Sequence, residues 1–340
     1  MCYLEILKVT IRGYMARSLL IFGNGLGMAL NSDYFRLACG LNAAWNATNT
    51  FTPEHKRLVA SAIPGVSDEQ YPESEEQLDR LQMALVASNF LRAFETKDVR
   101  WLTDTSRELP TAFRRFVHAV AVYFHESGLH LPLAFMEPLA DYIGKTRSHI
   151  AVLNYDNLLY DGLKSFNLLR GYQGALIDGF WRSTGFQTSN LERHAGRDSL
   201  GWYLHLHGSP LFVGNDKMMG TARDFLDPTA ESHIVLTHVH HKPSIIDSSH
   251  ILSEYWRRLN QALDEAEHVI LFGYSGEDLH LNEKIISAAT GKRVFIVEWA
   301  GTGDRAARYH YWATRLKGMR LELNALGNIL DFTEWSELGN

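Results

Sequence analysis

The stretch SLLIFGNGLG, residues 18–27, is the segment that decides the fold. Its first half, Ser18 to Phe22, is a continuous apolar run, which is typical of a strand buried on both faces of a parallel sheet. The glycines that follow permit positive φ angles and let backbone N–H groups approach a phosphate at the start of a helix. The third glycine comes too early for the dinucleotide-binding pattern G-x-G-x-x-G, and position 28 is methionine. Alone, the segment fits a phosphate-binding turn and an ordinary strand-to-helix turn equally well.

Similar apolar runs recur along the chain and alternate with stretches of helical periodicity. We predict further strands at 149–153, 201–207, 234–237, 268–272 and 293–297, with an edge strand at 319–323. We predict helices at 75–94, 109–125, 133–143, 251–267 and 282–290, and a loop at 63–72. Buried strands that alternate with helices predict an α/β fold, a Rossmann-like doubly wound parallel sheet. Residues 1–17 are then an N-terminal extension, 18–340 the domain, and about 35–146 a helical insertion or subdomain.

The composition restricts the class of protein. A chain of 340 residues with 46% hydrophobic and 21% charged residues can bury a sizeable core. A net charge of -6 argues against a dedicated nucleic-acid binder. Two cysteines, Cys2 and Cys39, can form neither a disulfide framework nor a four-cysteine zinc site. Because no apolar run approaches the ~20 residues of a membrane span, we expect a cytoplasmic protein without a membrane segment.

Polar residues follow the predicted strands at the sheet edge where ligands bind in open parallel sheets. Asn154-Tyr155-Asp156-Asn157 follows the strand at 149–153. Asparagine and aspartate are also common at turns and helix N-caps, which is the simpler interpretation of any one of them. A functional Asn154 would position a water molecule or a ribose hydroxyl with its amide.

A histidine pair lies at the end of the strand predicted at 201–207. Period-two geometry would put His205 and His207 on one face, as a metal pair requires. No carboxylate motif accompanies them, and a histidine followed by glycine at a strand end better suits an exposed general base. We therefore predict a base at His207 and no metal.

The segment Gly273-Tyr274-Ser275-Gly276-Glu277-Asp278 ends the strand predicted at 268–272. A glycine with a hydroxyl beside it would suit a nucleotide phosphate or ribose. The alternative is an ordinary strand-to-helix turn in which Ser275 or Asp278 caps the helix.

Two other groups of side chains favour a structural interpretation. The cluster of His233, His238, His240 and His241 lacks the nearby aspartate of a metallohydrolase, so we expect a surface or pocket-edge cluster. Trp299 and Trp312 are expected to be packing or interface residues rather than stacking platforms.

In their order along the chain, these strand-end motifs resemble those of the divergent bacterial sirtuin-like (silent information regulator type) NAD-binding family, best known for NAD-consuming effectors of antiphage defence. The segments that carry the resemblance are FGNGLG at 22–27, LNYDNLLYDGL at 153–163, HLHGS at 205–209 and VILFGYSGEDLHLNEKI at 269–285. The last is the most specific, because it resembles the Gly-Tyr-Ser-x-x-Asp-x-His-x-Asn signature of that group.

The resemblance implies that NAD is the substrate and that residues at the strand ends bind and cleave it. Asn154 would hold the nicotinamide ribose or the attacking water, and His207 would act as the general base. The implied NAD-binding residues are Gly23 and Gly25 along the pyrophosphate with Asn24 between them, Asp156 at the nicotinamide ribose, Gly273 with Ser275 on the adenosine side, and Glu298 at the adenosine ribose hydroxyls.

The chain departs from sirtuin deacylases because it lacks their zinc ribbon of two Cys-x-x-Cys pairs. We therefore expect a zinc-free NAD glycohydrolase of antiphage defence that releases nicotinamide and ADP-ribose. A non-catalytic sensor of NAD or ADP-ribose and an ADP-ribosyltransferase are the alternatives. The family also implies a homo-oligomer and a partner protein or activator that switches it on.

Overall fold

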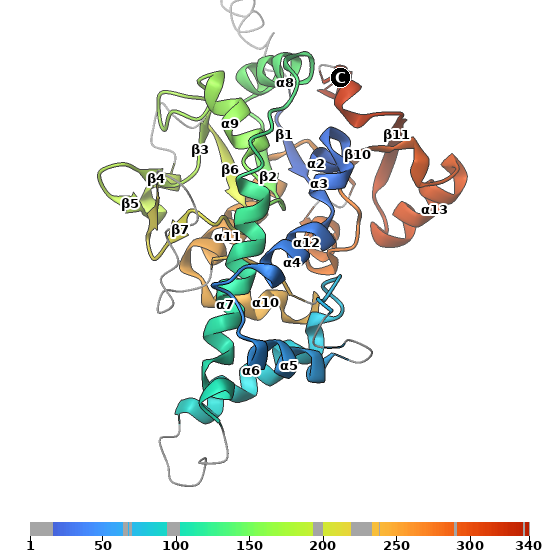
Figure 1. The fold of residues 1–340 in the computed structure, drawn as a ribbon. Helices are drawn as coiled ribbons and strands as arrows, with labels where there is room; N and C mark the ends of the chain where they lie inside the picture. Colours follow the sequence, from blue (N-terminus) through green and yellow to red (C-terminus); the bar gives the residue numbers. More distant parts are fainter. Residues whose placement is uncertain are drawn as a thin grey trace, which may run out of the picture.

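The computed structural model describes residues 16–63, 67, 70–93, 103–192, 200–218, 233–237, 239–288, 291–335 and 337–339. Its centre is a seven-stranded sheet in the order β11-β10-β9-β1-β2-β6-β3 (Figure 1). The strands are β1 (Ser18–Phe22), β2 (His149–Val152), β3 (Leu176–Ile177), β6 (Gly201–His205), β9 (His268–Phe272), β10 (Arg293–Trp299) and β11 (Arg320–Leu326). All pairs in this sheet are parallel, which confirms the predicted Rossmann-like α/β fold.

The first strand, β1, forms the middle of the sheet and is buried along its whole length. Leu20 pairs with Ile150 of β2 on one side and with Ile270 of β9 on the other. Because side chains alternate along a strand, Leu20 belongs to the hydrophobic core on one face of the sheet and Leu19 to the core on the other. The continuous apolar run is therefore explained by two covered faces.

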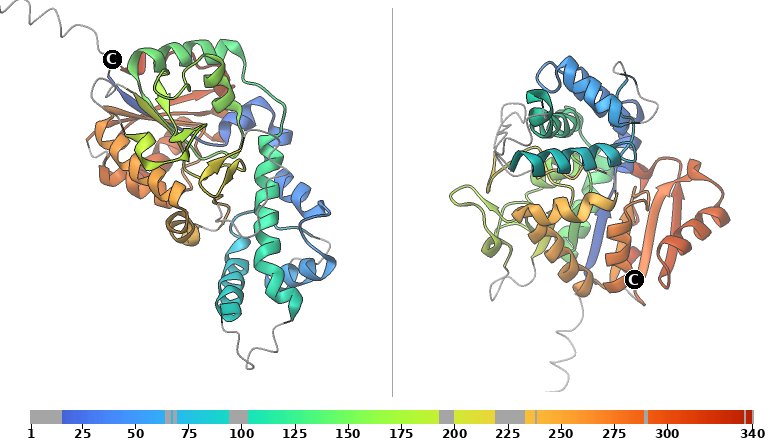
Figure 2. Two further views of the ribbon diagram at one scale, coloured as in Figure 1. Left: turned by 90° about the vertical axis from the view of Figure 1, so that its left-hand side faces the viewer. Right: turned by 90° about the horizontal axis from the view of Figure 1, so that it is seen from below.

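Helices fill the long connection between β1 and β2. They are α2 (Gly25–Leu30), α3 (Ser32–Phe35), α4 (Leu37–Asn46), α5 (Pro53–Ala62), α6 (Leu78–Ala93), α7 (Asp104–His125) and α8 (Leu133–Thr146). Helices α4, α5 and α6 pack against α7, and together these four form a helical arm that projects from the sheet (Figure 2). The arm lies where we predicted the insertion, and its status as a separate subdomain stays a prediction.

The remaining helices follow the later strands: α9 (Leu158–Ser165), α10 (Lys242–Ser248), α11 (His250–Glu265), α12 (Leu279–Ala288) and α13 (Arg305–Arg315). Helix α11 packs across β6 and β1 and supplies much of the second core, including Ile251, Tyr255 and Leu259. Two short hairpins, β4–β5 (Phe180–Trp181 and Gly185–Phe186) and β7–β8 (Phe212–Val213 and Asp216–Lys217), lie outside the main sheet. None of the helices within the described ranges is long and apolar enough to cross a membrane.

The structure corrects two of the predicted strands. The strand predicted at 201–207 ends at His205, and residues 206–207 form a turn. The strand predicted at 234–237 is wrong, because within the described residues this buried segment makes a single bridge, between Ile234 and Gly208, and no ladder. Gly208 has φ +82°, and a Cβ atom there would lie 1.5 Å from the carbonyl oxygen of His233, so the chain turns sharply where a ladder would continue. The segment 234–237 is apolar because it is buried, although it does not pair as a strand.

One edge strand was missed, and parts of two predicted segments lie outside the described residues. The two-residue edge strand β3 was not predicted, because so short a run carries no periodicity. Of the predicted N-terminal extension, residues 1–15 lie outside the described residues, as do 64–66 and 68–69 of the predicted loop.

Candidate functional site

The carboxyl ends of β1, β2, β6, β9 and β10 border one pocket of about 1160 Å³. This volume exceeds the ~300–1,000 Å³ typical of small-molecule sites, so the pocket has room for a dinucleotide. Parallel strands end at a common edge of the sheet, which is why motifs far apart in the sequence meet here. Every predicted site residue lines this pocket: Gly23, Asn24, Gly25, Asn154, Asp156, His207, Gly273, Ser275 and Glu298. Their individual roles stay predictions.

The glycines after β1 allow two turns to touch. The N–H of Gly23 donates to the carbonyl of Phe272 over 3.0 Å, and the N–H of Gly25 donates to the carbonyl of Gly273 over 2.8 Å. A Cβ atom on Gly25 would lie 2.5 Å from the Gly273 carbonyl oxygen, which only glycine avoids. Because both N–H groups already have acceptors, a pyrophosphate would be contacted by other groups of this turn. Asn24 holds the turn in place by donating from Nδ2 to the carbonyl of Phe35 over 2.8 Å.

Asn154 carries an unsatisfied polar atom beside the pocket. The residue is 7% exposed, and its Nδ2 donates to the carbonyl of Gly23 over 3.1 Å. Its Oδ1 is buried and, within the described part of the chain, has no hydrogen-bond partner. A buried amide oxygen without a donor lowers stability by about 1–3 kcal/mol. Because water cannot reach this oxygen in the present conformation, a water molecule or hydroxyl group would supply the missing donor only after a local rearrangement.

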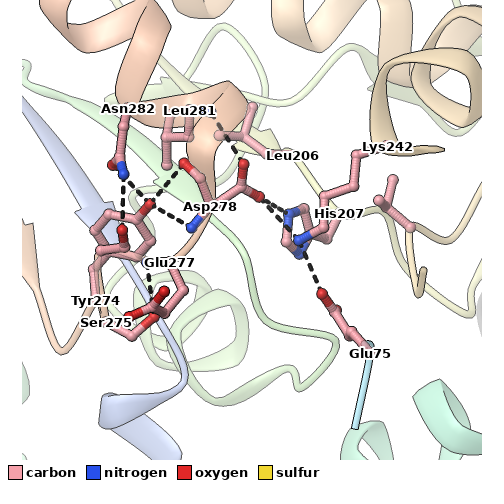
Figure 3. A network of polar contacts seen from close by, with 12 residues as sticks. Glu75, Leu206, His207, Lys242, Tyr274, Ser275, Glu277, Asp278, Leu281 and Asn282 are labelled. Carbon is pink, nitrogen blue, oxygen red and sulfur yellow. Dashed lines mark hydrogen bonds and ion pairs between the residues drawn. The ribbon is translucent and has the colours of Figure 1, made fainter. Parts of the chain in front are cut away.

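His207 lies in the turn after β6 and contacts a buried carboxylate; it is 7% exposed, so the expected exposure of this histidine is wrong. Its Nε2 is 3.0 Å from Oδ2 of Asp278, and Nζ of Lys242 is 3.1 Å from the same oxygen. Lys242 is also 3.1 Å from Oε2 of Glu75, which precedes α6 of the helical arm. These four side chains form a continuous ionic chain from the arm to His207 (Figure 3).

The charges in this ionic chain are set by the partners. Burial raises the pKa of Asp278, but the hydrogen bond from His207 and the positive charge of Lys242 outweigh it, so that pKa is lowered. Burial lowers the pKa of Lys242, but Glu75 and Asp278 outweigh it, so that pKa is raised. Near neutral pH, Asp278 is therefore an anion between two basic groups.

The loop that carries Asp278 is fixed by its own hydrogen bonds. The Tyr274 hydroxyl donates to Oδ1 of Asn282 over 2.9 Å and accepts from the N–H of Asp278 over 3.1 Å. Oδ1 of Asp278 accepts the N–H of Leu281 over 3.0 Å at the start of α12. Tyr274, Asp278 and Asn282 stand at the tyrosine, aspartate and asparagine of the signature pattern. The spacing of these three residues in the sequence therefore builds the loop, and the loop presents the carboxylate of Asp278 to His207.

Asp156 is a second buried carboxyl group on the pocket wall. Burial raises its pKa to about 6, although hydrogen bonds, including one from the N–H of Leu158 to Oδ1 over 3.1 Å, act in the opposite direction. The ionised form of Asp156 is therefore poorly stabilised by the protein alone.

On the pocket wall beside β10, unlike at Asp156, the carboxylate is already paired with basic and indole N–H groups. The carboxylate of Glu298 already accepts from Nε of Arg308 over 2.9 Å and from Nε1 of Trp312 over 2.9 Å. Ribose hydroxyls would have to share this carboxylate with the two side chains. Ser275 is exposed, and its Oγ accepts the N–H of Glu277 over 3.3 Å.

The histidines do not form a metal centre in the described residues. His205 is buried between the rings of Tyr203 and Phe212, and burial with the charges of Lys217 and His125 lowers its pKa well below the usual range. His207 instead turns to Asp278 in the pocket, so the two histidines do not act as a pair. Nowhere in the described ranges do three or more His, Cys, Asp or Glu side chains gather in an arrangement that could hold a metal ion.

The second histidine cluster is dispersed. Nδ1 of His233 contacts Oγ of Ser249 at 2.8 Å, and Nε2 of His241 contacts Oδ1 of Asp79 at 2.8 Å. His240 is exposed, and His238 lies outside the described residues.

Sequence reasoning missed three members of the site. Asp278 was considered only as a cap, although its place in the signature was a usable signal. Lys242 and Glu75 lie in segments without any motif, and only the fold brings them to Asp278.

Comparison with known proteins finds matches among solved structures alone. No family model matches the chain, and no curated protein matches it. Among solved structures, 22 chains match. One of them, described as "Structural Basis for the Mechanism and Regulation of Sir2 Enzymes", is 12% identical, with a TM-score of 0.39, over 98% of this chain and 95% of that chain.

Proposed function

We propose that this protein is an NAD glycohydrolase that cleaves NAD to nicotinamide and ADP-ribose. The observation that carries the proposal is the buried Oδ1 of Asn154, which lies beside the pocket without a partner in the described residues. Hydrolysis at the nicotinamide ribose requires an acceptor that orients a water molecule or a ribose hydroxyl, and this oxygen would take that role once bound substrate opens it to the pocket.

The reaction breaks the bond between nicotinamide and C1′ of the ribose, and the electron pair of that bond leaves with nicotinamide. The ribose passes through an oxocarbenium-like state, to which water adds at C1′. Asn154 would orient this water, and His207 would take one proton from it or from a ribose hydroxyl. The products are nicotinamide, ADP-ribose and a proton.

Asp278 supports the proposed role of His207. Since Nε2 of His207 is held by Asp278 over 3.0 Å, Nδ1 is the nitrogen that would accept the proton. A buried carboxylate next to the imidazole fixes the orientation of the ring and stabilises the imidazolium that forms. The chemistry also needs the nicotinamide ribose near Asp156, whose carboxyl group lines the same wall.

The proposed biological role is that of an antiphage-defence effector, which the strand-end motifs support by resemblance. In the same way, we propose a homo-oligomer that a partner protein or activator switches on in the cytoplasm. Zinc has no part in the proposed reaction.

The test is the release of nicotinamide from NAD by purified protein, compared with a double variant, Asn154→Ala with His207→Ala. We expect the double variant to lose about four orders of magnitude in rate, since each group contributes about 10²-fold or more. A matched control replaces the same residue types at exposed positions outside the pocket, Asn46→Ala with His240→Ala, and should match the wild type.

Equal activity in wild type and the double pocket variant would contradict the proposal. Saturable binding of NAD without product would indicate a sensor. Adenine-labelled NAD that becomes covalently attached to protein or nucleic acid would indicate an ADP-ribosyltransferase.

A further inference from the structure

Trp299 is an exposed tryptophan on the wall of the pocket. The residue is 59% exposed and lies at the end of β10, whereas Trp202, Trp312 and Trp335 are fully buried. Leu279, which is 50% exposed, lines the same pocket. Single exposed apolar residues are common on protein surfaces, but a large aromatic ring open to a pocket offers a flat apolar face to a ligand.

The indole ring of Trp299 rests on the backbone of Gly301. A Cβ atom built on Gly301 would lie 2.3, 2.5 and 2.6 Å from three carbon atoms of the ring, which shows how closely the ring lies on this residue. The turn that contains Gly301 is held by Oγ1 of Thr302, which donates to the carbonyl of Trp299 over 2.9 Å. One side of the ring therefore contacts Gly301, and the remaining surface of the ring is exposed. Trp299 is exposed, so of the expected packing or interface role the structure contradicts only packing, whereas Trp312 is buried as expected.

Trp299 lies at the opposite end of the pocket from Asn154 and His207. The proposed reaction puts nicotinamide at the ends of β2 and β6, which carry Asn154 and His207. In the sheet order β10-β9-β1-β2-β6, the end of β10 lies four strands from β6. At about 4.8 Å between neighbouring strands, this is roughly 19 Å. A molecule with a base at each end, joined through two riboses and a pyrophosphate, spans this edge when its second base reaches β10.

We infer that Trp299 is the platform on which the adenine ring of the substrate stacks. This inference rests on the proposed function, which fixes the nicotinamide end at Asn154 and His207. Stacking of a nucleobase on an aromatic side chain depends on the π-face of the base and not on hydrogen bonds. The side chain would thus determine affinity for the adenosine half and leave the chemistry at the nicotinamide ribose unchanged.

The experiment measures dissociation constants for NAD, ADP-ribose and nicotinamide mononucleotide by calorimetry, together with nicotinamide release. The variants are Trp299→Ala, Trp299→Phe and Gly301→Ala, with Trp181→Ala as the control, since Trp181 is also exposed (42%) but lies outside the pocket. Far-ultraviolet circular dichroism and melting temperature verify that each variant is folded.

We expect Trp299→Ala to weaken binding of NAD and ADP-ribose about ten-fold or more, and to leave nicotinamide mononucleotide unaffected. Trp299→Phe should retain most of the affinity. Gly301→Ala, which keeps the indole but displaces it, should lose part of the affinity. KM for NAD should rise in Trp299→Ala while kcat stays near the wild-type value.

Several outcomes separate this inference from the proposed function. Equal affinity of Trp299→Ala and wild type for NAD and ADP-ribose overturns the stacking role alone, and nicotinamide release then still supports hydrolysis. Loss of ADP-ribose affinity in Trp299→Ala, with no nicotinamide released by the wild type, supports the adenine platform and counts against hydrolysis. A wild type that binds neither NAD nor ADP-ribose overturns both.

Discussion

The two ends of the pocket differ in how far the protein satisfies its own polar groups. At the end formed by β2 and β6, the amide oxygen of Asn154 is buried without a partner in the described chain, and burial raises the pKa of Asp156 to about 6. At the end formed by β10, the carboxylate of Glu298 is bonded by Arg308 and Trp312, and the apolar ring of Trp299 is exposed. Unfilled hydrogen-bonding capacity therefore marks the end proposed for chemistry, and exposed apolar surface marks the end proposed for binding.

The largest expected effect follows from removing the charge at the β2 and β6 end. Asp278→Asn deprives both His207 and Lys242 of their buried anion. We expect kcat for nicotinamide release to fall about a hundred-fold or more, because the orientation of His207 is no longer fixed. The free energy of unfolding should fall by about 3 kcal/mol, the usual result when one partner of a buried ion pair is removed. Steady-state kinetics and urea denaturation measure the two effects.

The surface offers a matched control for this change. Asp141 pairs with Lys145 over 2.6 Å, and both side chains are 61% exposed. Asp141→Asn should leave nicotinamide release unchanged and cost at most about 0.5 kcal/mol, because exposed ion pairs are screened by solvent. Similar losses of activity and stability in Asp278→Asn and Asp141→Asn would show that the buried ionic chain has no special role.

The second prediction concerns the pH dependence of stability at Asp156. Its pKa in the folded protein is about 6, above the ordinary value of 3.8, so the folded state holds the proton more tightly than the unfolded state. The ionised form then destabilises the fold above pH 6, and this penalty disappears as the pH falls from about 6 to 4. Asp156→Asn, which keeps an acceptor for the N–H of Leu158, should be more stable than wild type by about 3 kcal/mol at pH 8 and by about half that at pH 5.

Urea denaturation of both proteins at pH 5 and pH 8 tests this prediction. A stability difference that does not change between the two pH values would contradict the burial of an ionisable group at this position. Activity should be measured in the same samples, since a gain in stability together with a loss of nicotinamide release would place Asp156 at the nicotinamide ribose.

The third prediction concerns the wall between the two ends, where the turns after β1 and β9 touch. Gly25→Ala would put a methyl group 2.5 Å from the carbonyl oxygen of Gly273, so the two turns must separate. We expect a loss of about 1–3 kcal/mol in the free energy of unfolding and weaker binding of NAD. Gly327 also lines the pocket, but nothing lies within 4 Å of a Cβ atom there, so Gly327→Ala should fold with near wild-type stability. Equal losses in the two variants would show that the contact between the turns is not what requires glycine.

The smallest expected effect is at the more open end. Ser275 is exposed, and its hydroxyl accepts one N–H bond within its own turn. Ser275→Ala should weaken NAD binding only about three-fold, the value of one solvent-accessible hydrogen bond, with kcat unchanged. A loss as large as that expected for Trp299→Ala would show that polar contacts and not stacking dominate at this end.

The amino-acid sequence by itself determined most strands of the sheet and the edge at which the pocket lies. Continuous apolar runs such as 18–22 and 268–272 specify strands because both faces of a central parallel strand must be buried. Residues that follow such strands, including Asn154 and His207, were placed at one edge by the rule that parallel strands end together. These inferences use only local pattern and direction, which a sequence contains.

Only the tertiary structure decided which side chains meet. Lys242 and Glu75 belong to no motif, yet they complete the ionic chain to His207, because ion pairs depend on atoms that approach within a few ångströms and not on sequence spacing. The same reason made 234–237 resemble a strand: its residues are buried, and burial leaves the same apolar pattern whether or not a ladder forms. The exposure of Trp299 likewise follows from where β10 ends and from its contact with Gly301, neither of which periodicity specifies.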